Sequence, residues 1–309
     1  MPTLLREHQW ELLDFNDEDR FLLFGTEDTG YLTLKPPEWA GGDARDSDTD
    51  RAQEDGRYFG RDLRGGLQAN FEIGVLTDHL ATLDSDAYQT NVDYLAALRS
   101  WWDDEDLRSK SWELAVLRTF VAGRVWRAYG RPRRFSEAAS KLQLLGYTPV
   151  VCDFAVIDNS VYADEAAQLN VALVSVPDGG LIAPLIAPLT TTPATMGERT
   201  AVVAGTRSTW PWVEFVGPVT NPKAQIGPLT VGLSTSIPEG TTVTVDPRPW
   251  SRGVTRDDGA SYAGYLSPDT PVLRELKIRP GSHQVIYSGI DATGTSECIV
   301  RWRDARSRP

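Results

Sequence analysis

The sequence contains few of the residues on which catalytic and metal sites depend. Its 309 residues include two Cys, two Met and three His, the histidines being His8, His79 and His283. None of the three histidines has a second His or Cys at the spacing of metal ligands. Asp78 precedes His79, but a catalytic triad also needs a placed nucleophile, and no G-x-S-x-G motif is present. We therefore expect no enzyme activity, no catalytic, cofactor-binding or metal-binding residue, and no cofactor.

Long apolar runs are missing as well. No stretch approaches the roughly 18 apolar residues of a membrane helix, so we expect no membrane insertion. The N-terminal residues MPTLLREHQW lack a basic region followed by an apolar core, so no signal peptide is expected. The glycine pairs within 64–66 and 178–180 do not continue into Gly-Lys-Ser/Thr, which excludes a phosphate-binding loop of that type.

The two cysteines lie far apart, each within an apolar stretch. Cys152 stands in VVCDFAV and Cys298 in SECIVRW. Two reduced, buried thiols are the expected state of such residues. The alternative is a disulfide that joins two domains.

Lysine is scarce, because only five of the 31 basic residues are Lys. Arg codons are rich in G and C, so this bias indicates a gene from a genome of high GC content. Acidic residues number 43, and the formal net charge is −12. This balance argues against a nucleic-acid-binding protein, which usually presents a basic surface.

The acidic residues gather in the segments 14–19, 43–55 and 103–106. Segment 43–55 has carboxylates at alternate positions, as a calcium-binding loop does, but it lacks the central Gly and the terminal Glu of such loops. Residues 40–57 contain almost nothing apolar, and we expect them to form a long solvated loop.

One cluster of Arg opposes the overall charge; it comprises Arg124, Arg127, Arg131, Arg133 and Arg134. An Arg side chain donates two parallel hydrogen bonds to a carboxylate. We expect the cluster to bind an acidic segment of a neighbouring subunit, with nucleic acid as the alternative.

The first half of the chain alternates between short apolar runs and turn signals. The runs predict strands at 21–25, 31–35, 67–75, 112–129 and 148–158, with a basic turn at 130–135. Val92, Leu95, Leu98 and Trp102 recur at helical spacing, which predicts one helix over 90–102. Thr90 or Asn91 is expected to cap its first turn.

The composition changes after residue 162. Residues 163–200 carry Pro177, Pro184, Pro188 and Pro193, which predicts an extended connector, although 170–176 could still form a strand. Residues 201–309 contain apolar runs at regular spacing, which is typical of a β-sandwich. The chain is therefore divided into 1–162, the connector 163–200, and 201–309.

Four tryptophans of the second half allow two interpretations; they are Trp210, Trp212, Trp250 and Trp302. Exposed aromatic rings could stack on sugars. The alternative is that these tryptophans only pack in the core and at interfaces, since aromatic side chains dominate core burial.

Several segments of residues 201–309 occur in a recognisable order: WP (210–211), FVGP (215–218), TNP (220–222), GTTVTVDP (240–247), RPGS (279–282), GIDATG (289–294) and VRWRD (300–304). This order resembles the galectin-like β-sandwich of distal tail proteins of siphophages. YFGRD (58–62), the predicted helix, GRPRRF (130–135) and the strand at 148–157 fall in the order of the family's N-terminal belt domain.

The resemblance implies a mainly β protein with one helix, in which a belt domain (a barrel or sheet plus a helix) precedes the sandwich. It further implies a hexameric ring in the virion, at the distal end of the tail. The expected partners are other copies of the chain, the tail-tube and tape measure proteins, the tail-tip and receptor-binding proteins, and double-stranded DNA in transit.

Two other functions remain open from the sequence. A carbohydrate-binding module that recognises the host surface would also suit a β-sandwich, because a fold does not determine a function. A hydrolase acting on the cell wall is the third interpretation.

Overall fold

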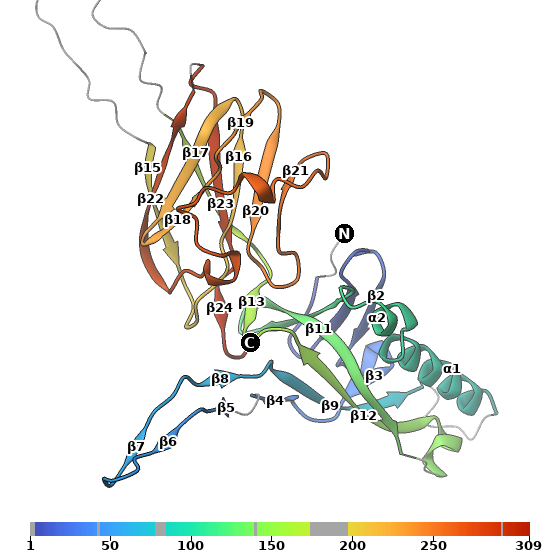
Figure 1. Ribbon diagram of the computed structural model, residues 1–309. Helices are drawn as coiled ribbons and strands as arrows, with labels where there is room; N and C mark the ends of the chain where they lie inside the picture. The colour runs from blue at the N-terminus through green and yellow to red at the C-terminus, as the bar shows by residue number, and fades with distance from the viewer. Residues whose placement is uncertain (1–3, 42–43, 78–84, 139–140, 174–196, 292) are drawn as a thin grey trace, which may run out of the picture. The chain divides into compact units, whose positions relative to one another are not determined.

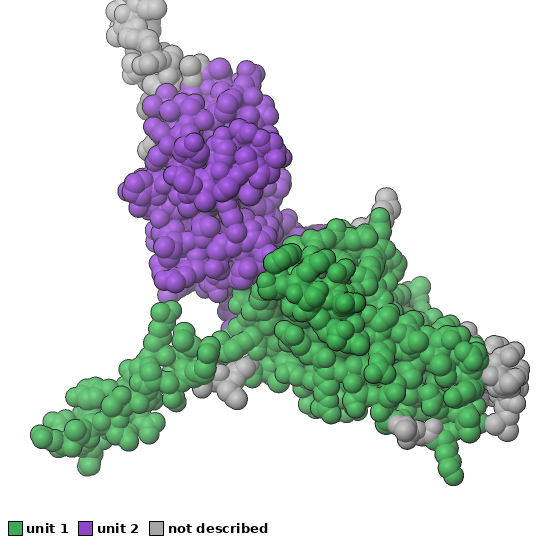
Figure 2. All heavy atoms as spheres, turned by 45° about the vertical axis from the view of Figure 1, so that its right-hand side comes forward, with its two compact units in different colours: residues 1–164, 306–309 green, residues 165–305 purple. Residues whose placement is uncertain are grey.

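The computed structural model describes residues 4–41, 44–77, 85–138, 141–173, 197–291 and 293–309. The chain divides into two compact units, shown in different colours in Figure 2. Unit 1 comprises Met1–Asp164 and Arg306–Pro309, and unit 2 comprises Glu165–Ala305. The chain therefore leaves unit 1 after Asp164 and returns to it at Arg306.

Unit 1 is built on one curved antiparallel sheet. In spatial order its strands are β2 (Phe21–Phe24), β1 (Trp10–Asp14), β10 (Ala115–Val121), β11 (Arg124–Glu137), β12 (Tyr147–Val156), β9 (Gln68–Leu76) and β3 (Tyr31–Thr33). The short strand β13 (Val161–Ala163) also pairs with β11. The strands predicted from the apolar runs are confirmed, with β10 and β11 as the predicted pair.

The sheet closes on itself beside Gly25. The Gly25 N–H donates to the Tyr31 carbonyl at 2.7 Å, and the Thr33 N–H donates to the Gly25 carbonyl at 3.1 Å, which joins the two edge strands. Gly25 has a φ of +118°, and a Cβ there would lie 2.2 Å from the His8 carbonyl oxygen. Only glycine fits both conditions, so this position allows the sheet to form a barrel.

Aromatic side chains fill the interior of unit 1. The ring of Phe71 meets those of Trp10 and Phe24 edge to face, with centroids 5.1 and 5.4 Å away. Alternate residues of each strand point inward, so Ala69, Phe71, Ile73 and Val75 of β9 are fully buried. Burial of this apolar surface is the main stabilising contribution to the barrel.

One long helix, α1 (Ser85–Trp102), packs Leu95, Leu98 and Trp102 into the same core. The predicted helix is confirmed, but its expected cap is wrong. Asn91 lies inside the helix and is fully buried, where it donates to the Val75 carbonyl at 3.0 Å. It also accepts from the Thr148 hydroxyl at 2.6 Å, so it ties the helix to the sheet. A second helix, α2 (Glu105–Ser109), follows and is capped by Asp104.

The described residues of 40–57 are almost all exposed, as expected, but short strand pairs make this segment part of a two-stranded arm and not a simple loop. After β4 (Glu38–Ala40), which pairs with β9, the arm consists of β5 (Ala44–Arg45) paired with β8 (Leu63–Arg64) and β6 (Thr49–Asp50) paired with β7 (Arg57–Tyr58). Figure 1 shows the arm extending from the barrel. Polar composition did not prevent pairing, because backbone groups make the ladder.

The basic turn predicted at 130–135 is also wrong, since these residues continue β11. The pairing of β11 with β12 shifts register between Pro132 and Phe135. Proline lacks the N–H of a regular ladder and is tolerated at such irregularities, so the strand passes through the proline instead of turning.

Unit 2 is a sandwich of two antiparallel sheets. The first has the order β14 (Ala167–Ala172), β23 (Glu297–Trp302), β16 (Trp212–Val216), β20 (Thr242–Asp246) and β21 (Gly253–Arg256). The second has β15 (Gly197–Val203), β22 (Gly281–Ile290), β17 (Val219–Ile226) and β18 (Leu229–Gly232), with β19 (Ser236–Ile237) also on β17. The mainly β fold class and the C-terminal sandwich are confirmed.

Two expectations for the second half need correction. The connector 163–200 includes β14 and the start of β15, so unit 2 begins at Glu165 and not at residue 201; the connector prolines lie outside the described residues. The run VLRELKI (272–278), one of the regularly spaced apolar runs of residues 201–309, forms no strand and includes the short helix η4 (Leu273–Glu275).

The thiol groups occupy separate cores. Cys152 is buried in unit 1 and Cys298 in unit 2, and both are free, which confirms the reduced state and contradicts a disulfide between them. Burial raises the pKa of both thiols, so neither is a reactive thiolate at neutral pH.

Candidate interaction surfaces

The arm is held together by contacts between its own strands. The Gly60 N–H donates to the Asp48 carboxylate at 2.9 Å, and Arg57 donates to Asp50 at 3.1 Å. The Arg51 guanidinium lies 5.0 Å from the centroid of the Tyr58 ring. A Cβ at Gly60 would lie 2.2 Å from the Ser47 Oγ, so this close crossing of the two strands requires glycine.

Large apolar side chains of the arm are exposed. The side chain of Phe59 is 86% exposed, that of Tyr58 63% and that of Leu63 48%. Tyr58 ends β7, and Phe59 follows it in the connection to β8. Single exposed apolar residues are normal, but several on one thin hairpin indicate a contact surface.

Unit 1 also contains an apolar pocket of about 490 Å³. Its walls come from the start of the chain, from residues 33–39 and from the end of β10. The lining residues are Glu7, His8, Trp10, Gly25, Thr33, Leu34, Lys35, Pro36, Pro37, Trp39, Thr119, Val121, Arg308 and Pro309. The ring centroids of Trp10 and Trp39, which both line it, lie 6.2 Å apart. No sequence pattern indicates this pocket, since its residues are distant along the chain and come together only in the folded unit.

Two of the acidic segments meet on unit 1. Asp14 and Asp17 from one segment and Asp104 and Asp106 from the other line a hollow of about 190 Å³. Arg20 forms ion pairs with both Asp14 and Asp104. Burial opposes ionisation of Asp104, but hydrogen bonds from Arg20 and from the Leu107 N–H outweigh it and lower its pKa. No group of His, Cys, Asp and Glu able to hold a metal occurs among the described residues.

The Arg cluster is not one surface. Arg131 donates to the carbonyl of Glu113 at 2.7 Å and to that of Lys110, so its guanidinium holds the chain after α2. Arg127 is paired with Asp164. Only Arg124, Arg133 and Arg134 are exposed. Arg124 lies at the opposite end of β11 from the other two, so an acidic partner would meet Arg133 and Arg134 alone.

A row of charged residues crosses three adjacent strands of unit 1. Glu11 lies opposite Arg118 on the neighbouring strand, and Arg118 lies opposite Arg127 on the next. Asp164, the last residue of unit 1 before the chain enters unit 2, accepts hydrogen bonds from Arg118 and Arg127. Burial by itself would raise the pKa of Asp164, but the two guanidinium groups outweigh it and lower this pKa. The row thus fixes the point at which the chain leaves the barrel.

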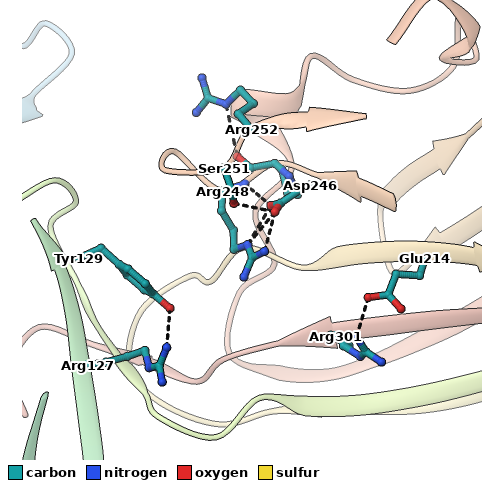
Figure 3. Close-up of polar contacts among 9 residues, drawn as sticks. Arg127, Tyr129, Glu214, Asp246, Arg248, Ser251, Arg252 and Arg301 are labelled. Carbon is teal, nitrogen blue, oxygen red and sulfur yellow. Dashed lines mark hydrogen bonds and ion pairs between the residues drawn. The ribbon is translucent and has the colours of Figure 1, made fainter. Parts of the chain in front are cut away.

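On unit 2, two tryptophans are covered by cations. The Lys277 ammonium lies 4.1 Å from the Trp210 ring centroid, and the Arg248 guanidinium lies 4.1 Å from that of Trp212. Figure 3 shows the Arg248 guanidinium donating hydrogen bonds to the Asp246 carboxylate. This carboxylate also accepts a hydrogen bond from the Ser251 hydroxyl at 2.6 Å. Trp210, Trp212 and Trp302 are buried. These three residues therefore form no exposed sugar-stacking platform, which favours ordinary packing for them, and Trp250 is half-buried.

The two histidines that the structure describes lie in different settings. His8 lines the pocket of unit 1, with a left-handed φ of 67°. His283 makes a hydrogen bond of 2.7 Å between its Nε2 and the Arg279 carbonyl. His79 lies outside the described residues. Over the described ranges, no helix is long and apolar enough to cross a membrane.

The fold can be compared with known proteins. No family model matches the chain, and no curated protein matches it. Among solved structures, the Dit (gp 19.1) protein of phage SPP1 aligns with a TM-score of 0.59 at 12% identity, covering 96% of this chain and 98% of that one. Its structure is described as a paradigm of hub adsorption apparatus in phages that infect Gram-positive bacteria. The baseplate of phage P2 in its activated conformation with Ca aligns at 0.48 and 10% identity, over 95% of this chain and 97% of that one. The fold of this chain is thus similar, from end to end, to that of a phage tail hub protein.

Proposed function

We propose that this chain is the distal tail protein of a siphophage, a structural component of the virion without enzymatic activity. The observation that carries the proposal is the alignment over 96% of this chain and 98% of the SPP1 Dit protein, which includes both units in the same order. An identity of 12% shows fold alone, so the function needs its own test. The order of sequence segments described above supports the same assignment independently.

In this proposal, six copies form a ring through unit 1, and unit 2 carries the galectin-like sandwich. The ring joins the tail tube and tape measure proteins to the tail-tip and receptor-binding proteins. Double-stranded DNA passes through its lumen during ejection. The projecting arm supports assembly, since a two-stranded ribbon is only marginally stable by itself and gains stability from a neighbour.

The mass of the purified protein in solution tests the ring. Six copies of the 34.1 kDa chain give about 205 kDa. Light scattering coupled to gel filtration should show this mass, or twice it for two rings back to back, and negative-stain images should show rings with a central hole. A monodisperse monomer at high concentration, without rings in images, would overturn the proposal.

A glycan array separates this function from the carbohydrate-binding alternative. We expect no binding at millimolar sugar, because Trp210, Trp212 and Trp302 are buried. Zymography on host cell walls tests the remaining hydrolase alternative, and a cleared zone would contradict a purely structural role.

A further inference from the structure

The segment that returns from unit 2 lines the apolar pocket of unit 1. Unit 1 includes Arg306–Pro309, and the last two of these residues line this pocket together with Trp10 and Trp39. We propose that residues 307–309 form a releasable cover of the pocket, and that an extended, proline-bearing segment of a partner protein takes their place. The inference concerns unit 1 alone and goes beyond the proposed ring.

The chain is well fixed up to Arg306. The Ala305 carbonyl accepts hydrogen bonds from the backbone N–H groups of Thr206 at 2.9 Å and Arg207 at 3.1 Å. The Arg306 guanidinium then lies 4.8 Å from the ring centroid of Trp126. Movement of the cover therefore begins after Arg306 and leaves the connection between the two units in place.

Residues 307–309 are held by contact with the pocket and not by polar bonds. Ser307 and Arg308 are exposed, and Pro309 is half-buried. None of the three makes a hydrogen bond or an ion pair with another residue that the structure describes. Proline also lacks the N–H group through which a backbone segment is usually fixed. Segments with few buried contacts and no such bonds open at low free energy, so we expect the cover to open while the barrel stays folded.

The walls of the pocket suit a proline. Trp10 and Trp39 contribute indole rings, and Pro36 and Pro37 contribute further apolar surface. Extended segments rich in proline bind in grooves that aromatic side chains line, since a polyproline II segment is already ordered before it binds. The residue that the chain itself places against these walls is Pro309. It therefore identifies the chemistry of the partner segment, which is an extended chain with a proline.

The cover leaves much of the pocket empty. About 490 Å³ remains beside Pro309, within the ~300–1,000 Å³ of pockets that bury small ligands. A longer segment would fill this space and make contacts that three residues do not make. The cover has the advantage that it is part of the same chain, which gives it a high effective concentration at the site. It therefore acts as an autoinhibitory contact, which weak partners do not displace.

The first test removes the cover. A chain that stops at Arg306 should bind the apolar dye anilinonaphthalene sulfonate with several-fold higher emission than the full chain, because the indole walls of the pocket become accessible. Pro309→Ala, which keeps the length of the chain, should give an intermediate emission. Val272→Ala is the control, since it removes an exposed apolar side chain from unit 2, and it should leave the emission unchanged. All three variants should keep the thermal transition of the wild type. Equal emission from the shortened and the full chain would overturn the cover.

The second test measures whether the pocket recognises proline. The peptide RDARSRP has the sequence of residues 303–309. It should displace the dye from the shortened chain, whereas the same peptide with Pro309→Ala should need a concentration on the order of tenfold higher, since it loses the ring that packs against the indoles. The full chain should need more of the first peptide than the shortened chain does, because its own cover competes. Equal displacement by the two peptides, or displacement by neither, would contradict recognition of a proline.

The two peptides also distinguish the pocket from partly unfolded protein, because dye bound to unfolded chain responds to neither sequence. Should the shortened chain melt at a lower temperature, Pro309→Ala in the full chain decides the first test. A negative result in both assays overturns the cover and leaves the proposed ring untouched, since neither assay depends on assembly. Absence of rings in the wild type would overturn the proposed function and leave the cover standing.

Discussion

Arg118 donates two parallel hydrogen bonds to Asp164, from Nε to Oδ1 at 3.0 Å and from Nη2 to Oδ2 at 2.9 Å. Arg127 adds a third, at 2.7 Å to Oδ1. The three side chains are largely buried. Asp164 is the last residue of unit 1 before the chain enters unit 2. These ion pairs therefore fix the position at which the chain leaves unit 1.

We expect Asp164→Asn to destabilise unit 1 by about 3 kcal/mol at neutral pH, since the buried Arg127 loses its counter-charge and Arg118 keeps only Glu11. Urea unfolding followed by tryptophan fluorescence measures the change. Asp269→Asn is the matched control, because it breaks an exposed pair with Lys223, and it should leave the free energy of unfolding nearly unchanged. Equal effects of the two variants would contradict the assigned role.

The same ion pair predicts a dependence on pH. The folded-state pKa of Asp164 is lowered from 3.8, so its contribution to stability is fully present above that value and is lost as pH falls through the lowered pKa. The stability difference between wild type and Asp164→Asn should therefore be constant from pH 5 to 7 and shrink below pH 3.8. A difference that persists unchanged at pH 2 would show that the charge of Asp164 is not responsible.

Gly60→Ala should loosen the arm and leave the barrel intact. The added Cβ would lie 2.2 Å from the Ser47 Oγ and 2.5 Å from its carbonyl oxygen, so the two strands of the arm must separate. Limited proteolysis should cut this variant near residue 60 faster than the wild type, without a change in the main thermal transition. Gly264→Ala is the control, since a Cβ there meets no atom within 4 Å. Equal cleavage of both variants would contradict this expectation.

The boundary of unit 2 predicts which fragment folds alone. Strand β14 pairs with β23 over six residues, from Ala167 opposite Trp302 to Ala172 opposite Glu297. A fragment of residues 165–305 should show a cooperative thermal transition. The fragment 201–309 lacks β14 and the start of β15, so it should melt at lower temperature or aggregate from its exposed edge. Identical melting curves would show that β14 contributes nothing to the sandwich.

The lumen of the proposed ring should repel DNA. Six copies at −12 give a charge of −72, and a duplex binds basic surfaces through counterion release. We expect no tight DNA binding by the assembled ring at low salt. Arg133→Glu combined with Arg134→Glu tests the exposed part of the Arg cluster. Tight, salt-sensitive binding that this double variant abolishes would place these arginines at the DNA.

The sequence predicted much of the secondary structure because apolar periodicity records burial directly. The helix was visible in Leu95, Leu98 and Trp102, and the sandwich in runs such as Thr242–Asp246. The arm was missed since its strands bury almost nothing, and pairing between polar residues leaves no hydrophobic pattern. Asn91 was misplaced for a related reason: a residue that often caps helices here satisfies its hydrogen bonds with Val75 and Thr148, which only tertiary structure brings near.

The candidate surfaces were harder to predict than the strands. The Arg cluster looked continuous in sequence, but Arg127 and Arg131 are used inside unit 1. The pocket combines residues from both ends of unit 1 in sequence, from Glu7 to Pro309. Such sites depend on contacts between distant residues, and composition or spacing along the chain does not record these contacts.

The return of residues 306–309 to unit 1 makes the sandwich an insertion within the barrel unit. The Arg306 guanidinium lies 4.8 Å from the ring centroid of Trp126, which secures the returning segment on unit 1. A module joined at both ends stays attached after a single backbone cleavage within it. Its host also keeps a complete barrel whichever sequence lies between residues 164 and 306. Recombination at these two joints would therefore exchange unit 2 while preserving unit 1, the part from which the ring is proposed to form.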